Sequence, residues 1–174
     1  MNHTHLTLRP WRLSDAAVLP GLIGDPAVQR NLRDGLPLPY TEEDARAFLT
    51  AMLAADPEEA FPFAIAWEDV AIGSLSLFRQ GNIHRCAAEL GYYLGRAYWG
   101  RGIMTWAVEA ACQWAFAHTD LLRIYAAPFA RNLSSCRVLE KAGFQLEGTL
   151  RQNAVKDGEV LDMKLYARLR DGRP

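Results

Sequence analysis

The sequence lacks several features that would restrict it to particular classes of protein. Its 19 basic and 20 acidic residues leave a formal net charge of −1, so we expect no broad positive surface for nucleic acid or an anionic membrane. No apolar run approaches the ~18 residues of a membrane span, and the first residues lack the apolar segment of a secretory signal. We therefore expect a cytoplasmic protein that binds neither nucleic acid nor membrane.

Cysteine is scarce as well. Cys86, Cys112 and Cys136 are odd in number, widely spaced and without a CxxC pair, which favours reduced, half-buried thiols over disulfides or zinc ligands. The four histidines have no spacing typical of a metal site, so we expect no bound metal. No tract rich in Pro, Gly or Ser separates two halves. The sequence predicts one domain over residues 1–174, with a core over about 6–168.

The order of the apolar patterns predicts an α/β (α+β) fold. Strands are predicted at residues 6–11, 61–67, 72–78, 86–95, 123–128, 144–151 and 159–169. Helices are predicted at residues 14–22, 42–54, 103–118 and 133–142.

Local signals define some boundaries of these elements. Ser14 is a suitable N-cap for the first helix, and Thr41 with Asp44 resembles a capping box at the start of the second. The pairs 68–69 and 157–158 are typical of tight turns, so each is expected to join two strands into a hairpin.

The stretch "YWGRGIMT" lies between the predicted strand 86–95 and the predicted helix 103–118. The first turn of a helix has unpaired N–H groups and a partial positive charge, and it binds an anion that can approach closely. Gly100 and Gly102 have no Cβ and would permit that approach; alternatively, they only form a tight turn. A P-loop is excluded because its Lys and Ser/Thr are absent, and Thr105 stands where a dinucleotide fingerprint requires Gly or Ala.

Two separated runs, residues 88–116 ("AELGYYLGRAYWGRGIMTWAVEAACQWAF") and 132–151 ("NLSSCRVLEKAGFQLEGTLR"), resemble the GNAT superfamily of acetyl-CoA-dependent N-acetyltransferases. Within it, the chain is most similar to the ribosomal-protein serine and alanine N-terminal acetyltransferases, over nearly its whole length. The resemblance implies a mixed, mostly antiparallel sheet of six to seven strands with about four helices. It also implies that the sheet is splayed between its fourth and fifth strands.

The pyrophosphate motif of the superfamily, Q/R-x-x-G-x-G/A, falls on residues 99–104. Trp99 in the first place is a common variant in this branch, whereas Met104 in the last place is less usual. By resemblance, the amides of about residues 101–105 hold the pyrophosphate, and strand residues 92–94 pair with the pantetheine arm. The resemblance assigns acetyl-CoA binding to Tyr92, Tyr93, Leu94, Trp99, Gly100, Arg101, Gly102, Ile103, Met104, Thr105, Asn132, Ser135 and Arg137.

The second run implies catalytic functions that have structural alternatives. Asn132 and Ser135 match positions that contact pantetheine and the thioester region in the family, but Asn132 is also a good N-cap and Ser135 an ordinary first-turn serine. Many relatives carry a tyrosine that protonates the departing thiolate where this chain has Leu139, so Ser135 is the nearest matching hydroxyl. Arg137 and Lys141 are either solvated or attract the 3′-phosphate.

Glu89 is the candidate general base. It shares a strand face with Gly91 and Tyr93, although a strand glutamate is more commonly solvated or ion-paired, and Asp162 is a second candidate. Deprotonating an α-amine of pKa near 8 costs about 1 kcal/mol at pH 7, against about 4 to 5 kcal/mol for a lysine. An α-amine therefore requires little help from a base.

The expected function is acetyl transfer from acetyl-CoA to a primary amine, by direct attack without an acyl-enzyme. A protein N-terminal α-amine, such as that of a ribosomal protein, is the first acceptor considered. A small amine (polyamine, aminoglycoside or amino acid) is the alternative acceptor. A non-catalytic sensor that binds acetyl-CoA is the alternative function. Residues 35–40 and the last hairpin are expected to frame the acceptor pocket. The sequence is compatible with a homodimer and does not define the oligomeric state.

Overall fold

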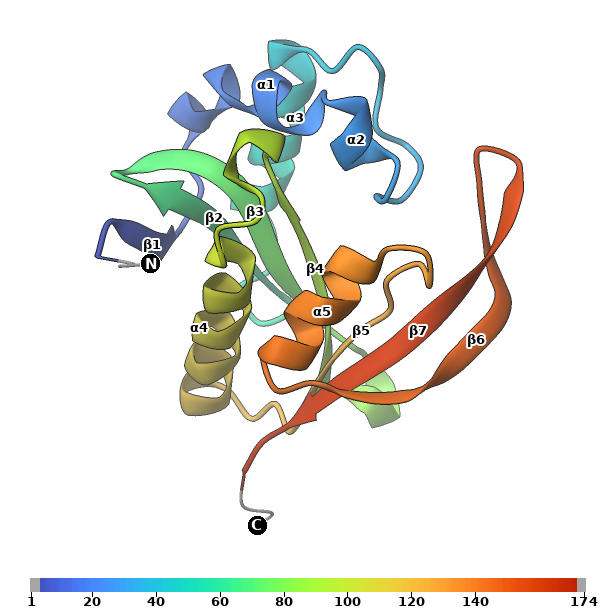
Figure 1. The fold of residues 1–174 in the computed structure, drawn as a ribbon. Helices are drawn as coiled ribbons and strands as arrows, with labels where there is room; N and C mark the ends of the chain where they lie inside the picture. The colour runs from blue at the N-terminus through green and yellow to red at the C-terminus, as the bar shows by residue number, and fades with distance from the viewer. Residues whose placement is uncertain (1–3, 172–174) are drawn as a thin grey trace. The chain divides into compact units, whose positions relative to one another are not determined.

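The computed structural model describes residues 4–171 of the chain. The chain divides into two compact units. The first unit contains the residues up to Ser76 together with Tyr92–Ile103, and the second contains Leu77–Gly91 and the residues from Met104 onward. Strands β3 and β4, which are labelled in Figure 1, each contribute residues to both units. The prediction of one domain over 1–174 stays a prediction.

Seven strands form one sheet, as the resemblance implied, in the order β1-β2-β3-β4-β5-β7-β6. The strands are β1 Leu6–Arg9, β2 Ala60–Trp67, β3 Val70–Arg79, β4 Ala87–Leu94, β5 Arg123–Ala126, β6 Gln145–Lys156 and β7 Glu159–Leu169. Neighbours pair antiparallel at β1–β2, β5–β7 and β6–β7, whereas β4 and β5 are parallel. The predicted mixed, mostly antiparallel sheet is confirmed.

The β4–β5 pairing is short. It joins Ala87 to Arg123, Ala88 to Ile124 and Glu89 to Tyr125, and ends there. Because β4 continues to Leu94 and β5 only to Ala126, the last part of β4 has no β5 residue as a ladder partner. The expected splay between the fourth and fifth strands stays a prediction.

The described residues contain five α-helices and three short 3₁₀ helices. The α-helices are α1 Leu19–Ile23, α2 Pro26–Gln29, α3 Glu42–Leu53, α4 Ile103–His118 and α5 Leu133–Lys141. The 3₁₀ helices are η1 Leu13–Ala17, η2 Asn82–His84 and η3 Arg96–Tyr98. No helix within residues 4–171 has the length and apolar character needed to cross a membrane.

The predicted cap at Ser14 is wrong. The N-cap of η1 is Arg12, whose backbone N–H donates to the Asp15 carboxylate at 2.9 Å. Arg9 holds the same carboxylate, so the turn begins before Ser14. The predicted helix is also divided in two, because Pro20 in the first turn of α1 has no N–H to continue the hydrogen bonds of η1.

The predicted capping box at the start of α3 is confirmed. The Thr41 hydroxyl oxygen accepts from the Asp44 amide at 3.2 Å, and the Asp44 carboxylate accepts from the Thr41 amide at 2.8 Å. The two hairpin turns are confirmed as well, with the left-handed backbone that a type I′ turn requires: φ is 48° at Glu68 and 67° at Asp69. Strand β6 runs to Lys156, five residues beyond the predicted 151.

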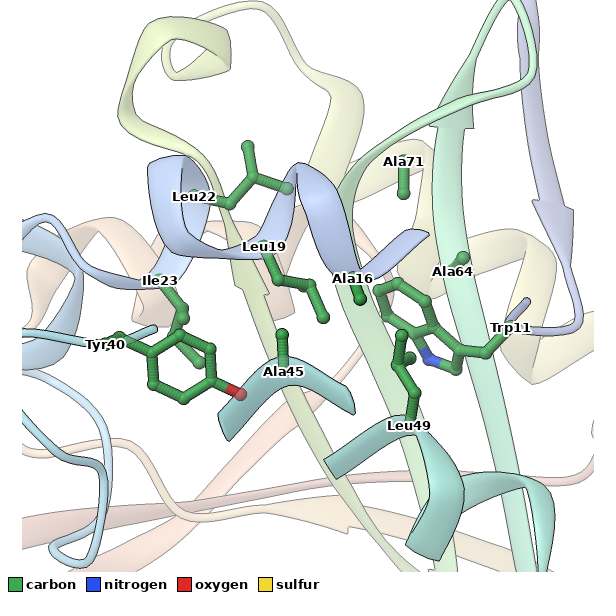
Figure 2. Close-up of a cluster of buried hydrophobic side chains, with 10 residues drawn as sticks. All are labelled: Trp11, Ala16, Leu19, Leu22, Ile23, Tyr40, Ala45, Leu49, Ala64 and Ala71. Atoms are coloured by element: carbon green, nitrogen blue, oxygen red, sulfur yellow. The ribbon is translucent and has the colours of Figure 1, made fainter. Parts of the chain in front are cut away.

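The core of the first unit is formed by side chains of α1, α3 and neighbouring segments (Figure 2). Leu19 and Leu49 are fully buried, and the Trp11 ring meets Phe48 edge-on at 6.2 Å. The complete buried cluster is Trp11, Ala16, Leu19, Leu22, Ile23, Tyr40, Ala45, Leu49, Ala64 and Ala71. This packing supports the end of β4 and the following η3, because Tyr93 and Tyr98 pack against the same cluster.

Helix α4 supplies much of the core of the second unit. Five of its residues are fully buried, namely Ala107, Val108, Ala111, Cys112 and Ala115. Its polar residues Thr105 and Glu109 are half-buried, and Gln113 is exposed. All three cysteines are free, and burial raises the pKa of the Cys112 thiol to about 12, so this thiol is protonated at neutral pH.

Candidate active site

Residues 99–102, which we call the glycine loop, connect η3 to α4. Gly100 and Gly102 have φ of +74° and +75°, in the left-handed region that favours glycine. A Cβ built on either residue would meet no heavy atom within 4 Å. All four loop residues are exposed, whereas the next residue, Ile103, is 1% exposed. The loop therefore offers open backbone immediately before a helix of 16 residues, an arrangement suited to a close-lying anion.

The side chains of the glycine loop attach it to preceding residues of the first unit. The indole N–H of Trp99 donates to the Leu94 carbonyl oxygen at 2.7 Å. The Arg101 guanidinium lies over the Tyr98 ring at 5.9 Å from its centroid. Sequence reasoning assigned Trp99 to cofactor binding but missed this hydrogen bond, since no local rule joins a tryptophan to a carbonyl five residues earlier.

The end of β4 contributes three of the predicted residues. Leu94 is buried, Tyr92 is half-buried, and the Tyr93 hydroxyl is buried with no hydrogen-bond partner among the described residues. Burial, and to a smaller extent Tyr40, raise the pKa of Tyr93, so the phenol stays protonated. The Tyr93 side chain packs against the core of the first unit, and the pairing of its backbone with pantetheine stays a prediction.

Glu89 is half-buried and is the last β4 residue that pairs with β5, opposite Tyr125. It therefore lies where the β4–β5 ladder ends. Its function as a base stays a prediction.

The N-terminus of α5 brings together Asn132, Ser135 and Arg137. The Asn132 side-chain oxygen accepts from the Ser135 backbone N–H at 3.2 Å, so Asn132 is the N-cap of α5. The structural alternative for Asn132 is thus correct, whether or not its amide also contacts a ligand. Ser135 is half-buried, and Arg137 and Lys141 are exposed.

Position 139, where many relatives carry a tyrosine, is a fully buried leucine. The hydroxyl that does reach α5 belongs to Tyr166 of β7, which donates to the Glu140 carboxylate at 2.9 Å. Burial and its hydrogen bonds with Glu140 and Cys136 raise the pKa of Tyr166. Tyr166 is 0% exposed, so it stabilises the packing of α5 on β7 and does not replace the missing acid.

Asp162, the second candidate base, has a structural function. Its carboxylate accepts from the backbone N–H of Gln152 at 2.8 Å, and Gln152 has a left-handed φ of 52° inside an irregular stretch of β6. Its backbone oxygen accepts from the Ala130 amide at 2.8 Å. Asp162 therefore shapes the β6–β7 hairpin and the segment that leads to α5. Among residues 4–171, no group of three or more His, Cys, Asp or Glu side chains could hold a metal ion.

Comparisons with known proteins agree with this architecture. The acetyltransferase (GNAT) domain model matches residues 5–145. The probable N-acetyltransferase YjcK of Bacillus subtilis is 41% identical over 131 residues, which make up 74% of this chain and 72% of that protein. The ribosomal-protein-S5-alanine acetyltransferase of Vibrio fischeri superposes with a TM-score of 0.87 at 26% identity, covering 100% of this chain and 98% of that one.

A second solved structure is RimL, a ribosomal L7/L12 α-N-protein acetyltransferase in complex with coenzyme A. It has a TM-score of 0.85 and 26% identity, and the match covers 97% of this chain and 96% of that one. The fold and these matches define an acyltransferase of the N-acetyltransferase class. The chain belongs to the GNAT acetyltransferase domain family, as its two sequence runs indicated.

Proposed function

We propose that this chain transfers an acetyl group from acetyl-CoA to the N-terminal α-amine of a protein, such as a ribosomal protein. The observation that carries the proposal is the glycine loop, with two left-handed glycines whose backbone faces open space before α4. Two similar solved structures, both ribosomal-protein acetyltransferases and one bound to coenzyme A, support the choice of cosubstrate and acceptor.

The residues present fit acetyl-CoA. The backbone amides of about residues 101–105 would hold the pyrophosphate, because a helix start attracts anions and the glycines leave the approach unblocked. Residues 92–94, Asn132 and Arg137 are the further contacts that the family resemblance proposes. When bound, acetyl-CoA supplies an activated thioester with a thiolate leaving group.

In this mechanism, Glu89 accepts a proton from the acceptor amine, directly or through water. The base has little work to do, since deprotonating an α-amine of pKa near 8 costs only about 1 kcal/mol at pH 7. The hydroxyl of Ser135 would donate a hydrogen bond to the leaving sulfur, replacing the tyrosine that position 139 lacks.

Two of the three thiols, those of Cys112 and Cys136, are too buried to support an acyl-enzyme. Cys112 is 0% and Cys136 3% exposed, and the raised pKa of Cys112 removes its thiolate at neutral pH. Direct attack of the amine is therefore the proposed route.

An acceptor panel tests the function. Peptides that copy the N-termini of ribosomal proteins are compared with polyamines, aminoglycosides and free amino acids, and thiol release from acetyl-CoA is followed. We expect turnover with peptides beginning in serine or alanine. Turnover only with small amines would favour the alternative acceptor class, and tight binding without turnover on any amine would favour a sensor.

A further inference from the structure

Trp99 lies in the first unit at the junction between β4 and the glycine loop, and it is 46% exposed. Although nearly half of the side chain is accessible, its indole N–H is directed to a protein acceptor, the Leu94 carbonyl at 2.7 Å. Leu94 itself is 7% exposed, so the acceptor belongs to a buried strand end. The hydrogen bond to Leu94 therefore fixes the exposed Trp99 side chain to the end of β4.

The hydrogen bond of Trp99 is the last in a series that follows the chain out of β4. The Gly95 amide donates to the Ile72 carbonyl at 2.9 Å, and the Tyr98 amide donates to the Gly95 carbonyl at 2.9 Å. The Trp99 amide then donates to the Arg96 carbonyl at 3.2 Å, and its indole returns to Leu94. After Trp99, the next buried residue is Ile103. Three exposed residues, two of them glycine, therefore span the interval between two fixed points.

We propose that Trp99 is a positioning residue for the glycine loop, acting through the hydrogen bond from its indole N–H to Leu94. The proposal rests on the function proposed above, in which this loop holds the pyrophosphate of acetyl-CoA. Glycine has the largest conformational freedom of any residue, so an unattached loop would lose more entropy when it binds an anion. Fixing its first residue reduces that loss before the ligand arrives.

The motif gives this inference a chemical basis. The superfamily places Gln or Arg in the first position, and Trp shares with them an N–H donor on a long side chain. If the donor is the required feature, Trp99→Phe should be harmful although it keeps an aromatic ring. Trp99→Gln, which removes the ring and restores an amide donor, should recover part of the function.

The experiment uses the full chain and three variants, with Trp67→Phe as the matched control. Trp67 lies on β2 and its ring stacks on His5 at 6.2 Å, so the same substitution there leaves the glycine loop untouched. Calorimetry with coenzyme A measures affinity, and steady-state kinetics separate KM for acetyl-CoA from kcat. Limited trypsin digestion of the free protein measures the rate of cleavage after Arg101.

We expect Trp99→Phe to weaken coenzyme A binding by about three- to tenfold, the usual range for one lost hydrogen bond. KM for acetyl-CoA should rise in parallel while kcat stays within about twofold, because the loop acts on ground-state binding. Cleavage after Arg101 should accelerate several-fold. Trp99→Gln should recover most of the affinity, and Trp67→Phe should match the unsubstituted protein.

Unchanged affinity and unchanged cleavage in Trp99→Phe would overturn the proposal. Equal losses in Trp99→Phe and Trp99→Gln would also overturn it, since the ring and not the donor would then matter. If the unsubstituted protein fails to bind coenzyme A, the proposed function fails, and the cleavage rates still test the attachment. Should Trp99→Phe not fold, hydrogen exchange of the Trp99 indole N–H in the unsubstituted protein decides: slow exchange supports the anchor and free exchange overturns it.

Discussion

The guanidinium of Arg9 makes two parallel hydrogen bonds to the carboxylate of Asp15, at 2.7 and 2.8 Å, and both residues are more than nine-tenths buried. The same guanidinium donates to the Asp69 carbonyl oxygen at 2.8 Å. One buried ion pair therefore joins β1, η1 and the β2–β3 turn within the first unit.

Asp15→Asn should destabilise the protein by about 3 kcal/mol at pH 7, because it removes the buried counter-charge of Arg9 and leaves only the exposed carboxylate of Asp69, 3.1 Å from the guanidinium Nε. Burial alone raises the pKa of Asp15, but the hydrogen bonds and charges of Arg9 and Arg12 outweigh it, so its pKa lies below the ordinary 3.8. A lowered folded-state pKa gives stability that is present above the unfolded pKa and is lost as pH falls through the folded one. The gap between wild type and variant, measured by urea unfolding, should therefore close below about pH 4.

Glu42→Gln is the control for this substitution. Glu42 pairs with Arg46 one turn along α3, and the two side chains are 50% and 60% exposed. Its loss should change stability by less than about 0.5 kcal/mol. An Asp15→Asn deficit as large at pH 3 as at pH 7 would assign the effect to packing and not to the charge pair.

The ion pair also explains why one part of the fold was predicted and another was not. Thr41 and Asp44 cap their helix through contacts three residues apart, so the sequence contains the whole signal. The start of η1 depends on Arg9, whose further partner Asp69 lies 60 residues away, and no local rule indicates that contact. The extension of β6 likewise depends on Asp162 supporting Gln152 across the hairpin.

Gly102→Val should weaken coenzyme A binding by at least about tenfold, because the new side chain would stand over the backbone that meets the pyrophosphate. Backbone strain is a second effect of this substitution, because φ is +75° at Gly102 and a branched residue with that φ destabilises the fold whether or not the loop binds a ligand. Gly158→Val in the β6–β7 turn is the matched control, with φ of +79° and open space around its Cβ. Calorimetry on both folded variants should show a loss of affinity at 102 alone; equal affinities would remove the anion-binding function of the loop.

Ser135→Ala should lower kcat by about a hundredfold and leave coenzyme A affinity within a few fold, because a hydroxyl that assists a leaving thiolate acts mainly in the transition state. The α5 cap survives this change, since Asn132 accepts from the backbone N–H of residue 135, which alanine retains. Ser134→Ala, at an exposed neighbouring position, is the control. Rapid-quench turnover and calorimetry separate the two quantities, and a fall in affinity with kcat intact would assign Ser135 to binding only.

The residues of the candidate site could be predicted from sequence motifs. The contacts that those residues make depend on tertiary structure and could not. Gly100 and Gly102 could be recognised from the sequence because left-handed backbone and close ligand approach both favour glycine. The two carboxylates proposed as bases, Glu89 and Asp162, have similar surroundings in the sequence. Only the fold distinguishes them. The Asp162 carboxylate accepts a hydrogen bond from the Gln152 amide, whereas Glu89 is the last β4 residue that pairs with β5.

Glu89→Gln tests the base and the acceptor together. The amide is nearly isosteric, so folding and coenzyme A affinity should be retained, while the rate should fall where the acceptor amine is mostly protonated. Asp162→Asn is the control carboxylate, because its remaining side-chain oxygen can still accept from the Gln152 amide. Its rate should be close to wild type at every pH.

The pH dependence of the Glu89→Gln deficit contains the decisive information. Raising the pH supplies free amine without help from the enzyme, so the deficit of a variant that lacks only the base must shrink as the pH approaches the pKa of the amine. That pKa is near 8 for a peptide N-terminus and above about 10 for a lysine-like or polyamine nitrogen, so the pH at which the deficit disappears also identifies the acceptor class. Rates measured with an α-amine peptide from about pH 6 to about pH 9.5 cover the transition. A deficit that stays constant over this range would mean that Glu89 orients the site, and proton removal would then proceed through water held by other groups.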